Sequence, residues 1–203
     1  MKKRVAVLIS GRGTNLQALM DARQDAYEIA LVISNRPDAE GLARARAAGI
    51  EALSIDHKPF GADREAFERE LDSALRARAI DIIALAGFMR VLTPYFVRAW
   101  AGRLINIHPS LLPKFPGTNT HARALEAGER EHGCSVHLVV EEVDSGEILG
   151  QARMPISPDD TPETLAARVL ELEHELYPKC LTDLTKTLRH PGHAKRDPGP
   201  RGS

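Results

Sequence analysis

Short apolar runs alternate with amphipathic segments along the first half of the chain. The apolar runs have the length of buried strands in a parallel sheet, and they fall at residues 5–10, 31–34, 50–55 and 80–86. Apolar side chains at helical spacing lie between them, at residues 15–23, 39–48 and 64–78. This alternation predicts an α/β fold: a doubly wound, mostly parallel, Rossmann-like sheet with helices on both faces.

The second half of the chain departs from this rhythm. A strand over residues 104–108 ends at Pro109, which is unfavourable inside a central strand. Two further strands, at residues 136–140 and 148–156, are joined by residues 141–147, a turn-like connection without a helical pattern. Such a connection predicts a hairpin, and with it an antiparallel strand in the C-terminal half.

The end of the chain combines a long helix with a tail. Thr161 can cap the N-terminus of this helix, with Pro162 in its first position. Residues 190–203 consist largely of Pro, Gly and basic residues, so we expect them to form a disordered tail. Residues 1–189 are then expected to form a single domain.

Composition narrows the class of protein. With 203 residues, of which 43% are hydrophobic and 27% charged, the chain is long enough to bury a core. A formal net charge of -1 does not support broad nucleic-acid binding, and no apolar stretch approaches the roughly 20 residues that span a bilayer. We expect Cys134 and Cys180 to be buried thiols in a cytoplasmic protein.

Candidate chemistry begins at the end of the strand over residues 104–108. Asn106 and His108 point to the same side of an extended strand, because side chains repeat every two residues. An amide donor beside a titratable imidazole suits polarising a carbonyl and moving a proton near neutral pH. For these two residues taken alone, an Asn that caps a turn beside a solvated His is the alternative interpretation.

A second candidate site is the glycine loop, residues 10–16, between the first strand and the first helix. Small residues and the free amides of a helix N-terminus can form a phosphate site. Leu16 stands where the dinucleotide fingerprint has its third glycine, Asn35 rather than an acidic residue follows the second strand, and no Gly-Lys-Ser/Thr follows. The loop therefore favours a monophosphate over NAD or ATP, with a purely structural turn as the alternative.

Asp144 lies in the turn of the predicted hairpin, in the sequence Asp-Ser-Gly-Glu. Its carboxylate could orient His108 and favour the imidazolium form, while an ordinary surface turn is the alternative. Three other polar residues, taken one at a time, are weak evidence for a functional site: His121, His137 and Glu173. The chain has no zinc signature and no Gly-x-Ser-x-Gly elbow of a serine hydrolase.

Taken together, these segments resemble one family. Residues 106–113, Asn-Ile-His-Pro-Ser-Leu-Leu-Pro, are similar to its catalytic signature. Three other segments are similar to its phosphate loop, its folate-pocket turn and its aspartate segment, at residues 7–17, 85–92 and 132–146. From about residue 5 to residue 177, the chain resembles the folate-dependent phosphoribosylglycinamide formyltransferase family.

The resemblance implies transfer of a formyl group from 10-formyltetrahydrofolate, a co-substrate, to the amine of glycinamide ribonucleotide in purine biosynthesis. It implies that Asn106 and His108 donate hydrogen bonds to a tetrahedral oxyanion, and that Asp144 holds His108 and relays a proton. It implies no metal and no covalent intermediate. The implied partners are the two small molecules, without nucleic acid or membrane, and the implied state is a monomer or homodimer.

The same resemblance implies substrate contacts in both halves of the domain. Gly13, Thr14 and Asn15 would hold the ribonucleotide phosphate in the N-terminal half, and Glu173 would contact the same substrate. Folate would be received by Arg64, Met89, Arg90, Val91, Leu92, Asn106, Glu141 and Asp144. The loop at residues 141–144, in the C-terminal half, would complete the folate pocket.

Two positions depart from the family pattern. Asn119 stands where many relatives carry histidine, so it is given no role. Leu170 stands where some relatives carry a polar residue, so we expect one nucleotide contact of the family to be missing. Related alternatives are a methionyl-tRNA formyltransferase, which normally has a further C-terminal domain, and a formyltetrahydrofolate hydrolase, which usually has an N-terminal regulatory domain. A catalytically silent folate- or nucleotide-binding module is the non-enzymatic alternative.

Overall fold

The computed structural model describes residues 2–22 and 26–188, and the predicted tail at residues 190–203 lies outside them. The described residues form a seven-stranded sheet. Its strands are β1 (Lys3–Ile9), β2 (Tyr27–Ser34), β3 (Ala52–Ser54), β4 (Ile82–Leu85), β5 (Leu104–His108), β6 (Glu131–Leu138) and β7 (Ile148–Pro155). Their order across the sheet is β3-β2-β1-β4-β5-β6-β7.

Strand directions follow the predicted plan. β1 pairs in parallel with β2 and β4, and parallel pairing continues to β3 and β5. β6 runs antiparallel to both of its neighbours, β5 and β7. A mostly parallel sheet with an antiparallel strand in the C-terminal half is therefore confirmed. The strand order reverses between β1 and β4, and ligands of open α/β sheets bind at the carboxyl ends of strands at such a reversal.

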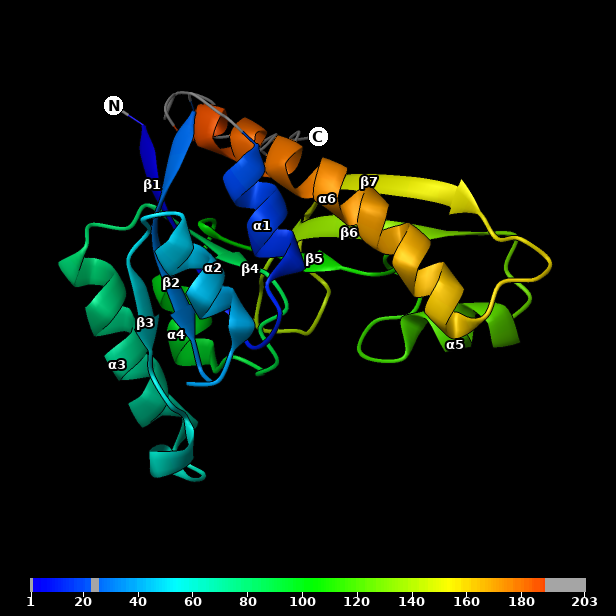
Figure 1. The fold of residues 1–203 in the computed structure, drawn as a ribbon. Helices are drawn as coiled ribbons and strands as arrows, with labels where there is room; N and C mark the ends of the chain where they lie inside the picture. Colours follow the sequence, from blue (N-terminus) through cyan, green and yellow to red (C-terminus); the bar gives the residue numbers. More distant parts are fainter. Residues whose placement is uncertain (1, 23–25, 189–203) are drawn as a thin grey trace, which may run out of the picture.

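Helices cover both faces of the sheet, as predicted (Figure 1). One face carries α1 (Thr14–Asp21), α2 (Glu40–Ala47) and α6 (Pro162–Thr187), and the other carries α3 (Arg64–Ala77) and α4 (Pro94–Ala99). A helix α5 (Thr120–Glu126) and a short 3-10 turn η1 (Lys58–Phe60) complete the described elements. The predicted cap of α6 is present, because the Thr161 side chain accepts a hydrogen bond from the Thr164 N–H and Pro162 is the first helical residue.

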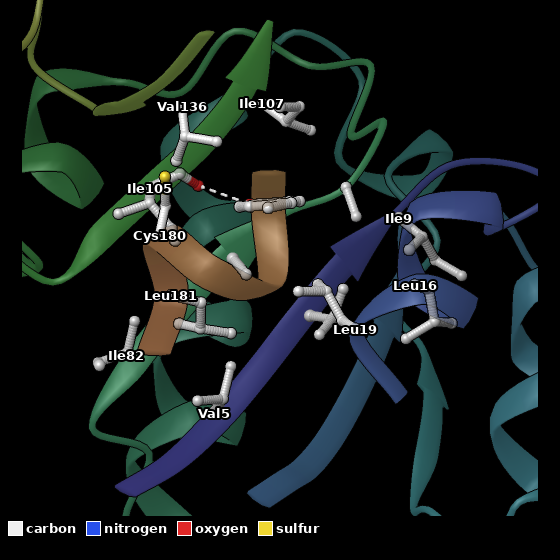
Figure 2. Packing of buried hydrophobic residues seen from close by; sticks show 14 of the residues in the cluster. Val5, Ile9, Leu16, Leu19, Ile82, Ile105, Ile107, Val136, Cys180 and Leu181 are labelled. Atoms are coloured by element: carbon white, nitrogen blue, oxygen red, sulfur yellow. Dashed lines mark hydrogen bonds between the residues drawn. The ribbon is translucent and has the colours of Figure 1, made fainter. Parts of the chain in front are cut away.

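Two apolar cores lie on opposite faces of the sheet. Val5 and Ile9 of β1 pack on one side with Leu16 of α1 and Leu181 of α6 (Figure 2). The alternate residues of β1 face the second core, where Phe67 of α3 is buried. Each fully buried aliphatic or aromatic side chain contributes about 1.5–3 kcal/mol. The two cores therefore hold the central strands, and with them the strand ends that carry the site.

Some elements differ from the sequence predictions. β6 begins at Glu131 rather than at residue 136, because pairing with β7 draws the preceding polar and glycine residues into the ladder. The sequence pattern does not predict α4 and α5, which have only 6 and 7 residues and are too short to show a helical period. Cys134 and Cys180 are buried and free, as predicted. Within the described residues, no helix combines the length and apolarity that a membrane crossing requires.

Candidate active site

Two cavities open at the carboxyl ends of the central strands. The first, the glycine-loop cavity of about 600 Å³, is lined by Ser10, Gly11, Arg12, Gly13, Thr14, Asn15, Asn35, Arg36, His57, Ala86, Gly87, Met89 and Arg90. The second, the β5 cavity of about 330 Å³, is lined by Leu85, Phe88, Met89, Arg90, Val91, Leu92, Val97, Asn106, Gly117, Thr118, His137, Val139, Val140, Glu141, Val143 and Asp144. Met89 and Arg90 line both cavities, so the turn after β4 is their common wall.

Glycine residues let the loop after β1 fold tightly against α2. Gly13 is the N-cap of α1 and has φ 75°, a left-handed conformation that glycine adopts without strain. A Cβ on Gly13 would lie 2.9 Å from the Cα of Gly41, and a Cβ on Gly41 would clash with Ile9. The Gly41 N–H donates to the Gly11 carbonyl oxygen over 3.1 Å, which holds the two segments together. The loop therefore depends on glycine at these positions.

The first turn of α1 faces the glycine-loop cavity with backbone donors. No side chain caps this helix end within the described residues, so the N–H groups of its first turn are left for another acceptor. Gly13, Thr14 and Asn15 all line the cavity. A helix end of this kind attracts anions through its N–H groups and its dipole. The arrangement fits the predicted phosphate site.

Asn15 also reaches the final helix. Its Nδ2 donates a hydrogen bond to the Oε2 of Glu173 over 2.7 Å, and both side chains are buried. Burial raises the pKa of Glu173, and the hydrogen bond from Asn15 opposes that rise. The structure thus joins two predicted substrate-binding residues from opposite ends of the chain, although Glu173 is not among the residues that line the cavity.

β5 brings Asn106 and His108 to its carboxyl end, as predicted. Asn106 lines the β5 cavity, whereas His108 is not among the lining residues and has 5% of its surface exposed. The Nε2–H of His108 donates to the carbonyl oxygen of Phe115 over 2.9 Å, and its Nδ1 faces the Oδ2 of Asp144 at 3.4 Å. Both ring nitrogens of His108 therefore face oxygen atoms of the protein.

Asp144 lies where the connection between β6 and β7 meets the loop after β5. It has φ 54°, a left-handed conformation that Asp tolerates better than most residues. Its Oδ2 accepts a hydrogen bond from the Gly117 N–H over 2.8 Å. Burial acts to raise the pKa of Asp144, but hydrogen bonds from His137 and Gly117 and the charges of His108 and His137 outweigh burial and lower that pKa. The carboxylate is therefore ionised at neutral pH.

His137 is a residue of the site that sequence reasoning left aside. It stands opposite Asn106 in the β5–β6 ladder and lines the β5 cavity. Its Nε2 lies 3.3 Å from the Asn106 Nδ2 and 3.5 Å from the Asp144 Oδ1, while its Nδ1 bonds the Leu138 carbonyl oxygen over 2.9 Å. The signal in the sequence is a polar side chain inside a strand of small and apolar residues, but its partners depend on the register.

The turn after β4 carries most of the other predicted folate contacts. Residues 89–92 line the β5 cavity, and the Nη1 of Arg64 donates to the carbonyl oxygen of Val91 over 3.3 Å from just outside that lining. Glu141 lines the cavity as well, but its carboxylate pairs with Arg98 of α4, with 2.6 Å between Oε1 and Nε. The rest of Glu141, rather than its carboxylate, is thus open to a ligand.

The two departures from the family pattern lie outside both cavity linings. Asn119 is the N-cap of α5, with a left-handed φ of 56°. Leu170 is half-buried on α6. The left-handed conformation of Asn119 is one that Asn tolerates better than most residues.

The site combines an amide, two imidazoles and one carboxylate at the wall of the β5 cavity. These groups can donate hydrogen bonds to an oxyanion and move a proton. The described residues hold no group of three or more His, Cys, Asp or Glu side chains placed to bind a metal ion.

Comparison with known proteins identifies the class to which this fold and site belong. Residues 3–181 match the family model described as Formyl transferase. That match covers most of the chain, and the chain therefore belongs to the formyl transferase family.

Individual relatives narrow the membership further. A phosphoribosylglycinamide formyltransferase from Haemophilus influenzae is 49% identical over 187 residues, which are 91% of this chain and 88% of the relative. The solved phosphoribosylglycinamide formyltransferase from Coxiella burnetii has a TM-score of 0.87 at 51% identity, covering 92% of this chain and 89% of that one. Within the family, the chain groups with the phosphoribosylglycinamide formyltransferases.

Longer relatives contain a region similar to this chain. The trifunctional purine biosynthetic protein adenosine-3 of Drosophila melanogaster is 54% identical over 188 residues, which are 90% of this chain but only 14% of that protein. The chain thus spans about a seventh of the length of this curated relative.

Proposed function

We propose that the protein transfers the formyl group of 10-formyltetrahydrofolate to the amine of glycinamide ribonucleotide, yielding formylglycinamide ribonucleotide and tetrahydrofolate in purine biosynthesis. One observation carries the proposal. Asn106, His108 and Asp144 meet at the end of β5, beside a cavity that shares a wall with the glycine-loop cavity. Two reactants could therefore bind in adjoining cavities and meet at these three residues. Membership of the phosphoribosylglycinamide formyltransferases supports the same reaction.

The ribonucleotide is assigned to the glycine-loop cavity. Its phosphate would accept hydrogen bonds from the first turn of α1, at Gly13, Thr14 and Asn15. Glu173, held by Asn15, would contact the remainder of the ribonucleotide. With the phosphate fixed at the end of β1, the glycyl amine would extend toward β5.

Folate is assigned to the β5 cavity. The backbone of residues 89–92 would meet the polar edge of the pterin, while the exposed side chains of Met89 and Val91 offer apolar contact. Arg64 and Arg90 are available to the acidic tail of the folate. The C-terminal half completes the pocket through Glu141 and Asp144.

The proposed reaction passes through a tetrahedral intermediate. The amine nitrogen bonds to the formyl carbon, and the bond from that carbon to the folate nitrogen then breaks. Asn106 faces the cavity and would donate a hydrogen bond to the oxyanion, and His108 would join it when its Nε2–H exchanges the Phe115 carbonyl for the substrate oxygen. Asp144 would hold His108 and relay the proton of the amine toward the departing folate nitrogen.

The proposed partners are these two small molecules. We propose that neither a metal nor a nucleic acid takes part, that the protein acts as a monomer or homodimer, and that it works in the cytoplasm. The near-neutral charge of the chain supports only the part of this proposal that concerns nucleic acid, because nucleic-acid binding usually requires a basic excess.

The test is formyl transfer from 10-formyltetrahydrofolate with glycinamide ribonucleotide present or omitted. We expect folate turnover only when the ribonucleotide is present, with formation of its formylated product. Release of formate without the ribonucleotide would instead identify a hydrolase. Binding of both compounds without any turnover would identify a silent binding module.

A further inference from the structure

The turn that forms the common wall of the two cavities, residues 86–93, is held by backbone hydrogen bonds. Its first N–H, on Ala86, donates to a carbonyl oxygen of β1 over 2.9 Å, and its last, on Thr93, donates to a buried carboxylate of α3 over 2.8 Å. The side chain of Met89, in the middle of the turn, is 78% exposed and offers little packing. The Met89 N–H donates to the Oγ of Ser10 over 2.8 Å, and this bond ties the centre of the turn to β1.

The Ser10 hydroxyl has both a donor and an acceptor partner within the protein. It accepts from the Met89 N–H and donates its own proton to the Oδ1 of Asn35 over 2.5 Å. Ser10 and Asn35 are buried, at 4% and 3% exposure. The Nδ1 of His57 lies 2.9 Å from the Asn35 carbonyl oxygen, to which it donates, and 3.2 Å from the Asn35 Nδ2. The Met89 N–H can only donate, so the direction of its bond to Ser10 is fixed.

This chain of bonds crosses the sheet where the strand order reverses. Met89 follows β4, Ser10 follows β1, Asn35 follows β2 and His57 follows β3. Ser10 is the first residue of the glycine loop, whereas Met89 lies on the turn that lines the β5 cavity. A single side chain at the edge of one cavity thus fixes the backbone that forms the wall of the other.

We propose that Ser10 is a positioning residue for the ligand of the β5 cavity. Ser10 holds the turn at residues 86–93 in the conformation that contacts the folate, although Ser10 itself lines only the glycine-loop cavity. The inference rests on the proposed function, because it takes folate as the ligand of the β5 cavity. Without the Ser10 hydroxyl, the Met89 N–H loses its acceptor, and the turn loses one of the contacts that hold it between Ala86 and Thr93.

The test measures binding of 10-formyltetrahydrofolate alone, by titration calorimetry without ribonucleotide. We expect Ser10→Ala to weaken this binding about tenfold, the effect of losing one net hydrogen bond of about 1–1.5 kcal/mol. Ser10→Thr keeps the hydroxyl and should regain most of the lost affinity. Ser34→Ala is the matched control, because Ser34 is also a buried serine at a strand end but its Oγ accepts from the Arg36 N–H.

Binding of each ligand separately distinguishes positioning from direct contact. A Ser10→Ala variant that binds glycinamide ribonucleotide less well but folate normally would show that Ser10 touches the ribonucleotide, and the inference would be overturned. Equal loss of folate affinity in Ser10→Ala and Ser34→Ala would overturn it too. Wild-type protein that binds no folate would instead refute the proposed function.

A second measurement needs no variant and covers the case in which Ser10→Ala fails to fold. Amide hydrogen exchange on the wild-type protein reports whether the Met89 N–H is bonded. We expect slower exchange at Met89 than at Val91, whose side chain is also exposed on the same turn, at 59%. Exchange at Met89 as fast as in an unfolded peptide would overturn the inference whatever ligand the protein binds.

Discussion

At the scale of single residues, the site is a small, mostly buried polar cluster centred on Asp144. Asp144 faces both His108 and His137 and accepts from the Gly117 N–H, while Asn106 contacts His137. Polar groups without partners are costly to bury, and hydrogen bonds between charged groups are the stronger ones. The carboxylate is therefore both the anchor of the cluster and its source of negative charge.

Replacing Asp144 by Asn should lower turnover strongly while the protein keeps its fold. The amide keeps the size of the side chain but removes the charge that faces His108, and general acid–base catalysis contributes typically about 10²–10⁴-fold. Turnover in the formyl-transfer assay measures the effect. Ser145→Ala, in the same exposed turn, is the control and should keep normal turnover. Near-normal turnover of Asp144→Asn would contradict the assigned role.

At the scale of elements, α5 is joined to the sheet by a pair of histidines. The Nδ1 of His121, on α5, lies 3.2 Å from the Nε2 of His132, on β6, and their rings meet edge to face. Burial, followed by the charge of His121, lowers the pKa of His132 to about 4, and burial also lowers the pKa of His121. The contact therefore requires at least one neutral imidazole.

Acid should loosen α5 before it unfolds the protein. An unfolded histidine takes up a proton near pH 6.5, but folded His132 does so only near pH 4. Between pH 4 and 6.5 the unfolded form thus binds more protons than the folded form. The contribution of His132 to folding stability is therefore complete above pH 6.5 and is lost as the pH falls toward 4. Amide hydrogen exchange at residues 120–126, corrected for the intrinsic effect of pH, should rise in that window.

The control for this pH effect is α3, a helix without histidine, whose corrected exchange should stay constant over the same range. A His132→Phe variant removes the group that titrates and should remove the pH dependence in α5. If α5 and α3 responded alike, the loosening would be global and the histidine pair would not be its cause.

At the scale of the whole molecule, α6 ties the sheet together beneath the site. The hydroxyl of Tyr177 is buried and donates to the carbonyl oxygen of Leu85 over 2.8 Å, with that of Ile105 at 3.3 Å. These carbonyls belong to β4 and β5, the strands that lead into the turn at residues 86–93 and the Asn106–His108 pair. Packing on one face of the sheet thus supports the chemistry at its edge.

Tyr177→Phe should lower the free energy of unfolding by about 1–2 kcal/mol, because it removes a buried hydrogen bond and leaves a carbonyl oxygen without its donor. Urea unfolding measures the change. Tyr95→Phe is the control, since the ring of Tyr95 contacts Arg69 and Phe preserves that ring. If the Tyr177 variant were no less stable than the Tyr95 variant, the hydrogen bond of the Tyr177 hydroxyl would contribute nothing to the free energy of unfolding.

Local patterns predicted much of this molecule. The apolar runs indicated the parallel strands, the hairpin connection indicated the reversed strand, and Thr161 with Pro162 marked the start of α6. The spacing of Asn106 and His108 placed both residues at a strand end. Such features depend on residues close together in the chain, whose conformational preferences act before any distant contact forms.

Contacts between distant segments could not be predicted in this way. His137 joins the site because the antiparallel register sets it opposite Asn106, and a shift of one residue would turn it to the other face. Asn15 meets Glu173 because α6 packs beside α1. α4 and α5 are shorter than the window over which a helical period can be recognised.

There is a physical reason why some features follow from the sequence alone and others only from the tertiary structure. Side-chain periodicity, glycine conformation and helix capping are properties of a few consecutive residues, so the order of elements, the fold class and the glycine loop could be read from the chain itself. The Ser10–Met89 bond, the common wall of the two cavities and the surroundings of Asp144 join segments far apart in the chain. Their geometry depends on register and on the packing of both cores, which local preferences do not specify.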